Sequence, residues 1–195
     1  MRRADLEEAI RAATEIIRQD EVLIIGSQSI LGSYSENDLP VAATLSAEVD
    51  IVPLKDDSMS LVADTLDGAA GEWSPFHEAH GFYIQGVGRE TADLPSGWEE
   101  RLVRVPVIGV GVGDSEGGHP TGISERTGLC LDPHDLCIAK LSAFREKDLA
   151  FVSSLIDVSY VDPRLLKDRL AQTDLHPQKV EVISNWLDIF IRPNP

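Results

Sequence analysis

The chain has 195 residues, of which 43% are hydrophobic and 26% charged, so it can bury a core, and a wholly disordered chain is excluded. Its 17 Lys and Arg against 33 Asp and Glu give a formal net charge of −16. This charge disfavours generic DNA binding and an anionic membrane, since both need clustered cations, but it allows a polyphosphate substrate whose charge metal ions neutralise.

The first two thirds of the chain mix helical and strand patterns. Apolar residues recur at helical spacing in residues 4–19, and the apolar run before Gly26 is typical of a strand buried on both faces. Charged and apolar residues alternate in 48–54, which predicts a second strand. The other elements expected here are a short helix at 27–31, a helix at 58–70, strands at 81–87, 101–112 and 129–131, and a loop at 113–122.

The last third of the chain has helical patterns only. Asp132-Pro133 opens a helix, because the Asp side chain can cap it and Pro suits its first turn. Helices are expected at 133–146, 147–158, 163–171 and 177–191. This order of elements predicts an α+β fold, in which a mixed sheet with flanking helices carries a C-terminal helical bundle. Residues 1–132 would form the α/β core and 133–195 the helical part of one compact domain.

The N-terminus and the cysteines bear on the compartment. No apolar segment follows Met1-Arg2-Arg3, and no apolar run is long enough to span a bilayer, so a cytoplasmic protein without a signal peptide is expected. Cys130 and Cys137 are too few for a disulfide framework, and their spacing fits no zinc motif. We expect two reduced, half-buried thiols.

The most informative pattern is Gly26-Ser27 followed by Glu48-x-Asp50. Residues i and i+2 of a strand project to one face, which places the two carboxylates about 6–7 Å apart along the strand. Such a pair repels unless a cation lies between its members, and Mg²⁺ binds one or two carboxylates together with substrate phosphates. The glycine allows close approach of the backbone, and the Ser27 hydroxyl with nearby amides can hold a phosphate.

Plainer interpretations stay open for each of these features. An acid-x-acid pair is common on the solvated face of an edge strand, and Gly-Ser is often only a turn. Basic residues of the 133–158 region can form a solvated helical face with salt bridges, although Lys140 borders the apolar stripe. His77 and His80 are predicted to cap a loop rather than bind a metal, because no third ligand is nearby.

The motifs "IIGSQSIL…AEVDIVPL" resemble the signature of the minimal nucleotidyltransferase superfamily, which has the polymerase-beta-like fold. The segment "LDPHDLCIAKLSAFREKDLAFVSSLI" is similar to the Lys-then-Arg-x-Lys-Asp helix of nucleotidyltransferase-like proteins related to the AbiEii toxins. The segments "GFYIQGV" and "LPSGWEERLV" also resemble small stand-alone bacterial members of that group. The resemblance covers roughly residues 20–158.

The resemblance implies an enzyme that moves a nucleoside monophosphate from an NTP to an acceptor hydroxyl. Glu48 and Asp50 would bind Mg²⁺, with Mn²⁺ as the other ion left open. Lys140 would reach the triphosphate as a point charge. The resemblance also implies nucleotide-binding roles for Gly26, Ser27, Arg145, Lys147 and Asp148, the last three orienting the nucleotide or holding their helix against the sheet.

Two departures from the family pattern keep a second function open. Glu48 stands where the family often has Asp, and the later strands supply no inward acid, which leaves Asp93 in a loop or Asp148 as a third carboxylate. The alternative is therefore a non-catalytic nucleotide-binding or toxin–antitoxin-like interaction protein. The acceptor, which can be an RNA, a protein or a small molecule, and the partner, a second copy or an antitoxin-like protein, both stay open.

Overall fold

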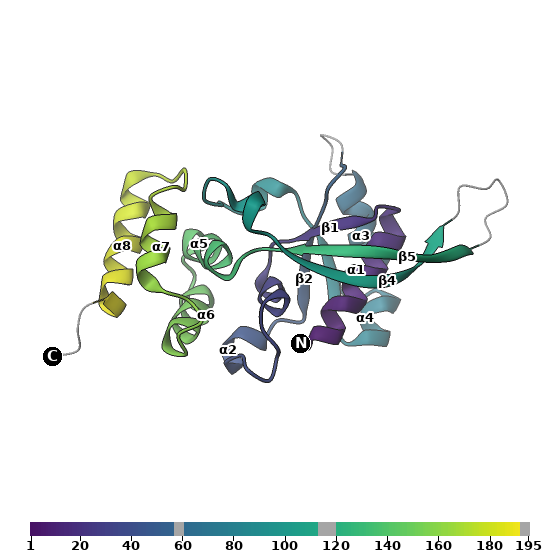
Figure 1. The fold of residues 1–195 in the computed structure, drawn as a ribbon, viewed down its shortest axis with the longest axis horizontal. Helices are drawn as coiled ribbons and strands as arrows, with labels where there is room; N and C mark the ends of the chain where they lie inside the picture. The colour runs from purple at the N-terminus through teal and green to yellow at the C-terminus, as the bar shows by residue number, and fades with distance from the viewer. Residues whose placement is uncertain (57–60, 113–119, 192–195) are drawn as a thin grey trace.

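A five-stranded mixed sheet forms the centre of the protein in a computed structural model, which describes residues 1–56, 61–112 and 120–191 (Figure 1). The strands are β1 (Glu21–Ile24), β2 (Glu48–Pro53), β3 (Tyr83–Gly86), β4 (Val103–Val112) and β5 (Pro120–Cys130). Their order is β3-β2-β1-β5-β4, with β1 parallel to β5 and antiparallel to β2, β2 parallel to β3, and β4 antiparallel to β5. The predicted α+β class with a mixed sheet and flanking helices is confirmed.

Helices flank the sheet and gather at one of its ends. Figure 1 shows α5 to α8 beyond the C-terminal end of β5, while α1 crosses the sheet. The helices are α1 (Arg3–Ile17), α2 (Val41–Thr44), α3 (Leu61–Ala70), α4 (Pro75–His80), α5 (Pro133–Ala143), α6 (Glu146–Asp157), α7 (Pro163–Leu170) and α8 (Pro177–Ile191), and the short 3-10 helices are η1 (Ser27–Gly32), η2 (Arg89–Thr91) and η3 (Trp98–Arg101). Within the described ranges, no helix is long and apolar enough to cross a membrane.

Local signals in the sequence explain where the C-terminal helices begin and end. Asp132 accepts a hydrogen bond from the backbone N–H of His134 (2.9 Å), so the predicted cap of α5 is present. The same arrangement at Asp162 caps α7. The predicted helix at 133–146 stops earlier, at Ala143, because Phe144 has a left-handed backbone with φ of 53°.

The core runs continuously from the sheet into the helical bundle. Its buried side chains come from α1, all five strands and α5 to α8, and include Ile10, Ile24, Ile51, Leu136 and Leu187. Gly128 of β5 allows α1 to approach closely, since a Cβ there would come within 2.4 Å of the Ile10 side chain. The packing of α1 on this face leaves the opposite face of β2, which carries Glu48 and Asp50, turned away from the helix.

Three expectations need correction. Residues 120–122 of the loop predicted at 113–122 belong to β5, which runs from Pro120 to Cys130 along β4, whereas 113–119 lie outside the described residues. The strand predicted at 129–131 is present, but it is only the end of this longer β5. Long antiparallel pairing, which extends β5, has no local signal in the sequence. The cysteines are free but fully buried rather than half-buried, and burial raises the pKa of Cys130 to about 12.

Candidate functional site

The Gly26-Ser27 turn and the two acids of β2 meet at one edge of the sheet. In the antiparallel pair of β1 and β2, Ile24 lies opposite Ile51, and the N–H of Ile25 donates to the carbonyl of Asp50 (3.2 Å). The chain leaves β1 at this point and enters η1. The register therefore brings together two motifs that are some twenty residues apart in the sequence.

Gly26 and Asp50 are in direct contact. A Cβ placed on Gly26 would lie 1.7 Å from Oδ2 of Asp50, a distance that no side chain could keep. Glycine is required here because the carboxylate occupies the space of a side chain. The turn therefore lies against the carboxylate, and Gly26 and Asp50 line one pocket together with Ala139 and Lys140 of α5.

Glu48 and Asp50 interact with each other on the same face of β2. Burial is the main cause that raises the pKa of Asp50 to about 7, and a hydrogen bond with Glu48 and the Glu48 charge raise it further, while Lys140 and Lys147 oppose the shift. Near pH 7 the pair is therefore partly protonated, because burial first and the neighbouring Glu48 second disfavour a second ionised carboxylate. A bound cation would relieve the same repulsion.

Lys140 projects from α5 into the same region, and 14% of its side chain is exposed. Burial lowers the pKa of its ammonium group, whereas Asp148 first and Asp50 second raise it. Its Nζ lies 3.8 Å from Oδ1 of Asp148 and 5.8 Å from the centre of the Phe151 ring. Lys140, which borders the apolar stripe of its helix, is thus mostly buried, and its ammonium group lies close enough to Asp50 to feel the charge of that carboxylate.

Asp148 connects two of the predicted basic residues. It is 1% exposed, and its Oδ2 lies 2.6 Å from Nε of Arg145. The same Oδ2 accepts from the backbone N–H of Arg145 (3.4 Å), which caps α6. Asp148 is therefore engaged with both Arg145 and Lys140, and it positions the two side chains.

Two pockets adjoin the site, and Lys140 lines both of them. One of about 350 Å³ lies between α2 and α6, and its polar lining comes from Ser27, Ser46, Lys140, Lys147 and Asp148. The other, of about 100 Å³, is lined by Gly26, Asp50, Arg145 and the segment at Thr91 and Ala92. Apart from Glu48, which is tied to Asp50, every predicted site residue lines one of these two pockets.

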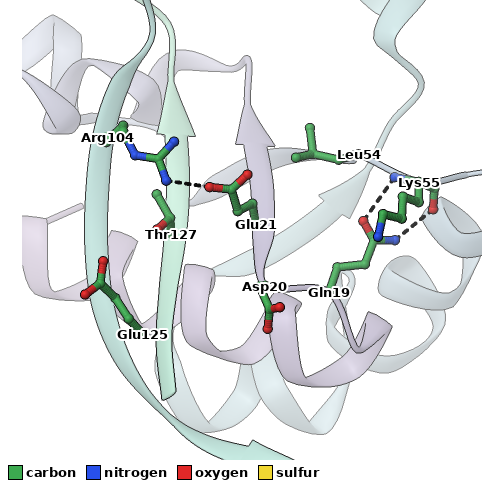
Figure 2. A pocket seen from close by; sticks show the side chains of 8 residues that line it. All are labelled: Gln19, Asp20, Glu21, Leu54, Lys55, Arg104, Glu125 and Thr127. Atoms are coloured by element: carbon green, nitrogen blue, oxygen red, sulfur yellow. Dashed lines mark hydrogen bonds and ion pairs between the residues drawn. The ribbon is translucent and has the colours of Figure 1, made fainter. Parts of the chain in front are cut away.

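A third pocket, of about 440 Å³, lies at the opposite end of β1 (Figure 2). Figure 2 shows Arg104 paired with Glu21, and the side chain of Gln19 bonded to the backbone of Lys55. Glu21 pairs with Arg104 there and Asp20 pairs with Arg126, and the pocket contains neither the glycine turn nor the acid pair. It is therefore not the candidate site, despite its larger volume.

The donor set of the site fits an ion that takes few protein ligands. Within the described part of the chain, no group of three or more His, Cys, Asp or Glu could hold a metal ion. Asp93, considered above as a third acid, lies 3.8 Å from Lys179 of α8 instead. Two carboxylates, Glu48 and Asp50, remain, and this number suits Mg²⁺, which keeps water and phosphate ligands.

Sequence reasoning missed Tyr83, the first residue of β3. Its hydroxyl donates to Oε2 of Glu48 (3.2 Å), because β3 pairs in parallel with β2 and Tyr83 lies beside Glu48. No local pattern reveals which strands pair, so the sequence contained no signal for this contact. His77 and His80 lie in the helix α4 rather than a loop, although Nδ1 of His77 accepts from the backbone N–H of Trp73 (3.1 Å).

Replacing Gly26 by alanine tests whether the turn positions Asp50. The new methyl group must displace the carboxylate, so Mg²⁺-dependent ATP binding should weaken about tenfold or more. Calorimetry would measure the affinity. Gly68→Ala is the matched control, since nothing lies within 4 Å of a Cβ there, and equal losses in both variants would contradict the role given to Gly26.

No family model, no curated protein and no solved structure matches this chain.

Proposed function

We propose that the protein is a Mg²⁺-dependent nucleotidyltransferase, built on a nucleotidyltransferase-like core, that moves a nucleoside monophosphate from an NTP to an acceptor hydroxyl. The observation that supports this most is the contact between Asp50 and Gly26, because it unites the acid pair with the phosphate-binding type of turn. Lys140, held close to that pair, supplies the positive charge that a triphosphate needs.

Each residue then has a defined role in binding. The backbone of Gly26 and the hydroxyl of Ser27 contact the terminal phosphates, with Ser27 at the wall of the larger pocket. Lys140 approaches the phosphates from α5, and Asp148 holds it there. Lys147, exposed at the rim, adds a second cation, and Arg145 reaches the smaller pocket.

The proposed chemical step transfers a nucleotidyl group from the NTP to the acceptor. The acceptor oxygen forms a bond to the α-phosphorus, the bond from that phosphorus to the bridging oxygen breaks, and pyrophosphate leaves while the hydroxyl proton passes to solvent. Mg²⁺ bound by Glu48 and Asp50 would neutralise the charge that develops on the phosphates. Tyr83 fixes the orientation of Glu48 through its hydroxyl, and Lys140 stabilises the departing charge.

One observation favours the alternative, a nucleotide-binding protein without transferase activity. Among the described residues only two carboxylates, Glu48 and Asp50, are at the site without an ion pair, since Asp148 is engaged with Arg145 and Lys140 and Asp93 lies near Lys179. Without a third acid, activation of the acceptor hydroxyl is weaker. The same pockets would then hold the nucleotide for an interaction with another protein.

Transfer of radiolabel from each of the four α-labelled NTPs separates these functions. The acceptors offered are pooled RNA, a peptide mixture and small alcohols, with Mg²⁺ or with a chelator. We expect label transfer and pyrophosphate release with Mg²⁺ only, and a loss of about 100-fold in Lys140→Met. Lys55→Met, an exposed lysine in the remote pocket, is the matched control and should keep full activity. Metal-independent NTP binding with no pyrophosphate from any mixture would establish the alternative.

A further inference from the structure

Trp73 is an exposed aromatic residue with an unusual backbone. Trp73 is 81% exposed, and its φ of 67° lies in the left-handed region that bulky residues rarely adopt. The hydrogen bond from its N–H to Nδ1 of His77 holds this conformation at the start of α4. The backbone therefore carries local strain where it presents an indole to solvent, and strained residues of this kind cluster at functional sites.

The indole begins a strip of rings that leads to the acid pair. The ring centres of Trp73 and His77 are 6.1 Å apart, and those of His77 and Tyr83 are 5.1 Å apart. The hydroxyl of Tyr83 then donates to Glu48 (3.2 Å). We call Trp73, His77 and Tyr83 the aromatic strip. It connects an exposed surface directly to the site at which transfer is proposed.

Acidic groups adjoin the aromatic strip. Glu72 precedes Trp73, and both Glu72 and Glu78 of α4 are exposed. At the other end of the strip, the Tyr83 hydroxyl donates to the carboxylate of Glu48. The cations of the site, Lys140 and Lys147, belong to α5 and α6, which Figure 1 shows on the other side of β2 from α4.

We propose that the aromatic strip binds a basic segment of a protein and that a hydroxyl of this segment is the acceptor. This inference rests on the proposed function and names its acceptor. Arg and Lys side chains stack favourably on an indole, and the neighbouring carboxylates complement their charge. The net charge of −16 adds to that attraction and repels an RNA acceptor.

The dimensions of the strip suit a short extended peptide. Two ring-to-ring contacts, of 6.1 Å and 5.1 Å, and one hydrogen bond of 3.2 Å lead from Trp73 to Glu48, so a few extended residues, each advancing roughly 3.3 Å, can reach from one to the other. A basic residue stacked on Trp73 would thus place a Ser, Thr or Tyr a few positions along the chain beside Glu48. The exposed residue selects the segment, and the acid pair receives its hydroxyl.

Fluorescence anisotropy with a labelled peptide of Lys, Arg, Gly and Ser tests the surface without nucleotide or metal. The wild-type protein should bind this peptide, and it should bind neither a version with Glu for Lys and Arg nor single-stranded oligoadenylate. Trp73→Asn should weaken peptide binding about fivefold, because the ring is lost while Asn tolerates the backbone conformation. Trp73→Phe keeps a ring and should retain most of the affinity.

Equal affinities for wild type and Trp73→Asn would overturn the inference, as would Trp73-dependent binding of oligoadenylate, which would indicate a nucleic acid instead. The proposed function fails in a distinguishable way. Trp73-dependent peptide binding with no label transfer from any NTP would overturn the transferase activity and leave the docking surface, whereas transfer to another acceptor without peptide binding would overturn the inference alone.

Discussion

Asp50→Asn is expected to lower nucleotidyl transfer by about 100-fold or more, the largest effect on activity that the structure predicts. The substitution keeps the size and the contact with Gly26 but removes the negative charge from the acid pair. Label transfer from the preferred NTP at saturating Mg²⁺ would measure the loss. The control is Glu125→Gln, because Glu125 is an exposed acid of β5 at the remote pocket, and this variant should leave transfer unchanged. A comparable loss in the control would show that transfer does not depend specifically on Asp50.

The same variant should be more stable than the wild type at neutral and alkaline pH, which rules out unfolding as the reason for lost activity. The pKa of Asp50 is raised in the folded state, so folded protein binds the proton more tightly than unfolded protein does. The contribution of Asp50 to wild-type stability is therefore fully present below the unfolded pKa near 3.8 and is lost as the pH rises through about 7. Melting curves should show Asp50→Asn gaining several degrees over wild type at pH 8 and none at pH 4. A melting temperature of Asp50→Asn below that of wild type at pH 8 would contradict this account.

Asp148→Asn is expected to cause the largest loss of stability, about 3–5 kcal/mol, or about 10 °C in melting temperature. The carboxylate is 1% exposed and pairs with Lys140, which is itself mostly buried, so its removal leaves a buried ammonium without its partner. The deficit should shrink as the pH rises, because burial already lowers the pKa of Lys140 and an uncharged amine needs no counter-charge.

Asp188→Asn is the control for Asp148→Asn. Asp188 pairs with Lys167 at 2.8 Å, but both side chains are about one third exposed. An exposed pair of this kind contributes about 1 kcal/mol or less. Chemical denaturation of the two variants would measure the contrast, and equal losses would show that the burial of Asp148 does not govern its contribution.

Local chemistry made much of the fold predictable. The starts of α5 and α7 follow from an Asp that caps the helix and a Pro in its first turn. The alternation of β2 placed Val49 and Ile51 in the core and Glu48 and Asp50 on the other face, as the burial of the strand confirms. These features depend only on residues that are close to one another in the sequence, so the sequence alone is enough to predict them.

Features that depend on long-range pairing could not be predicted. The length of β5 is set by β4, and the contact of Tyr83 with Glu48 is set by the parallel register of β3. The contact of Gly26 with Asp50 follows from the register of β1 and β2, which the motif order suggested but could not fix. The engagement of Asp148 by two cations also joins separate helices, so its positioning role was not visible.

Calorimetric titration of ATP into the protein, with Mg²⁺ and with a chelator, tests most directly the claim that the acid pair, the glycine turn and Lys140 form one nucleotide site. The account predicts binding of wild type in the presence of Mg²⁺, little or none with the chelator, and loss of the Mg²⁺-dependent part in Asp50→Asn. ATP that bound with equal affinity in both conditions, or to Asp50→Asn as to wild type, would contradict it.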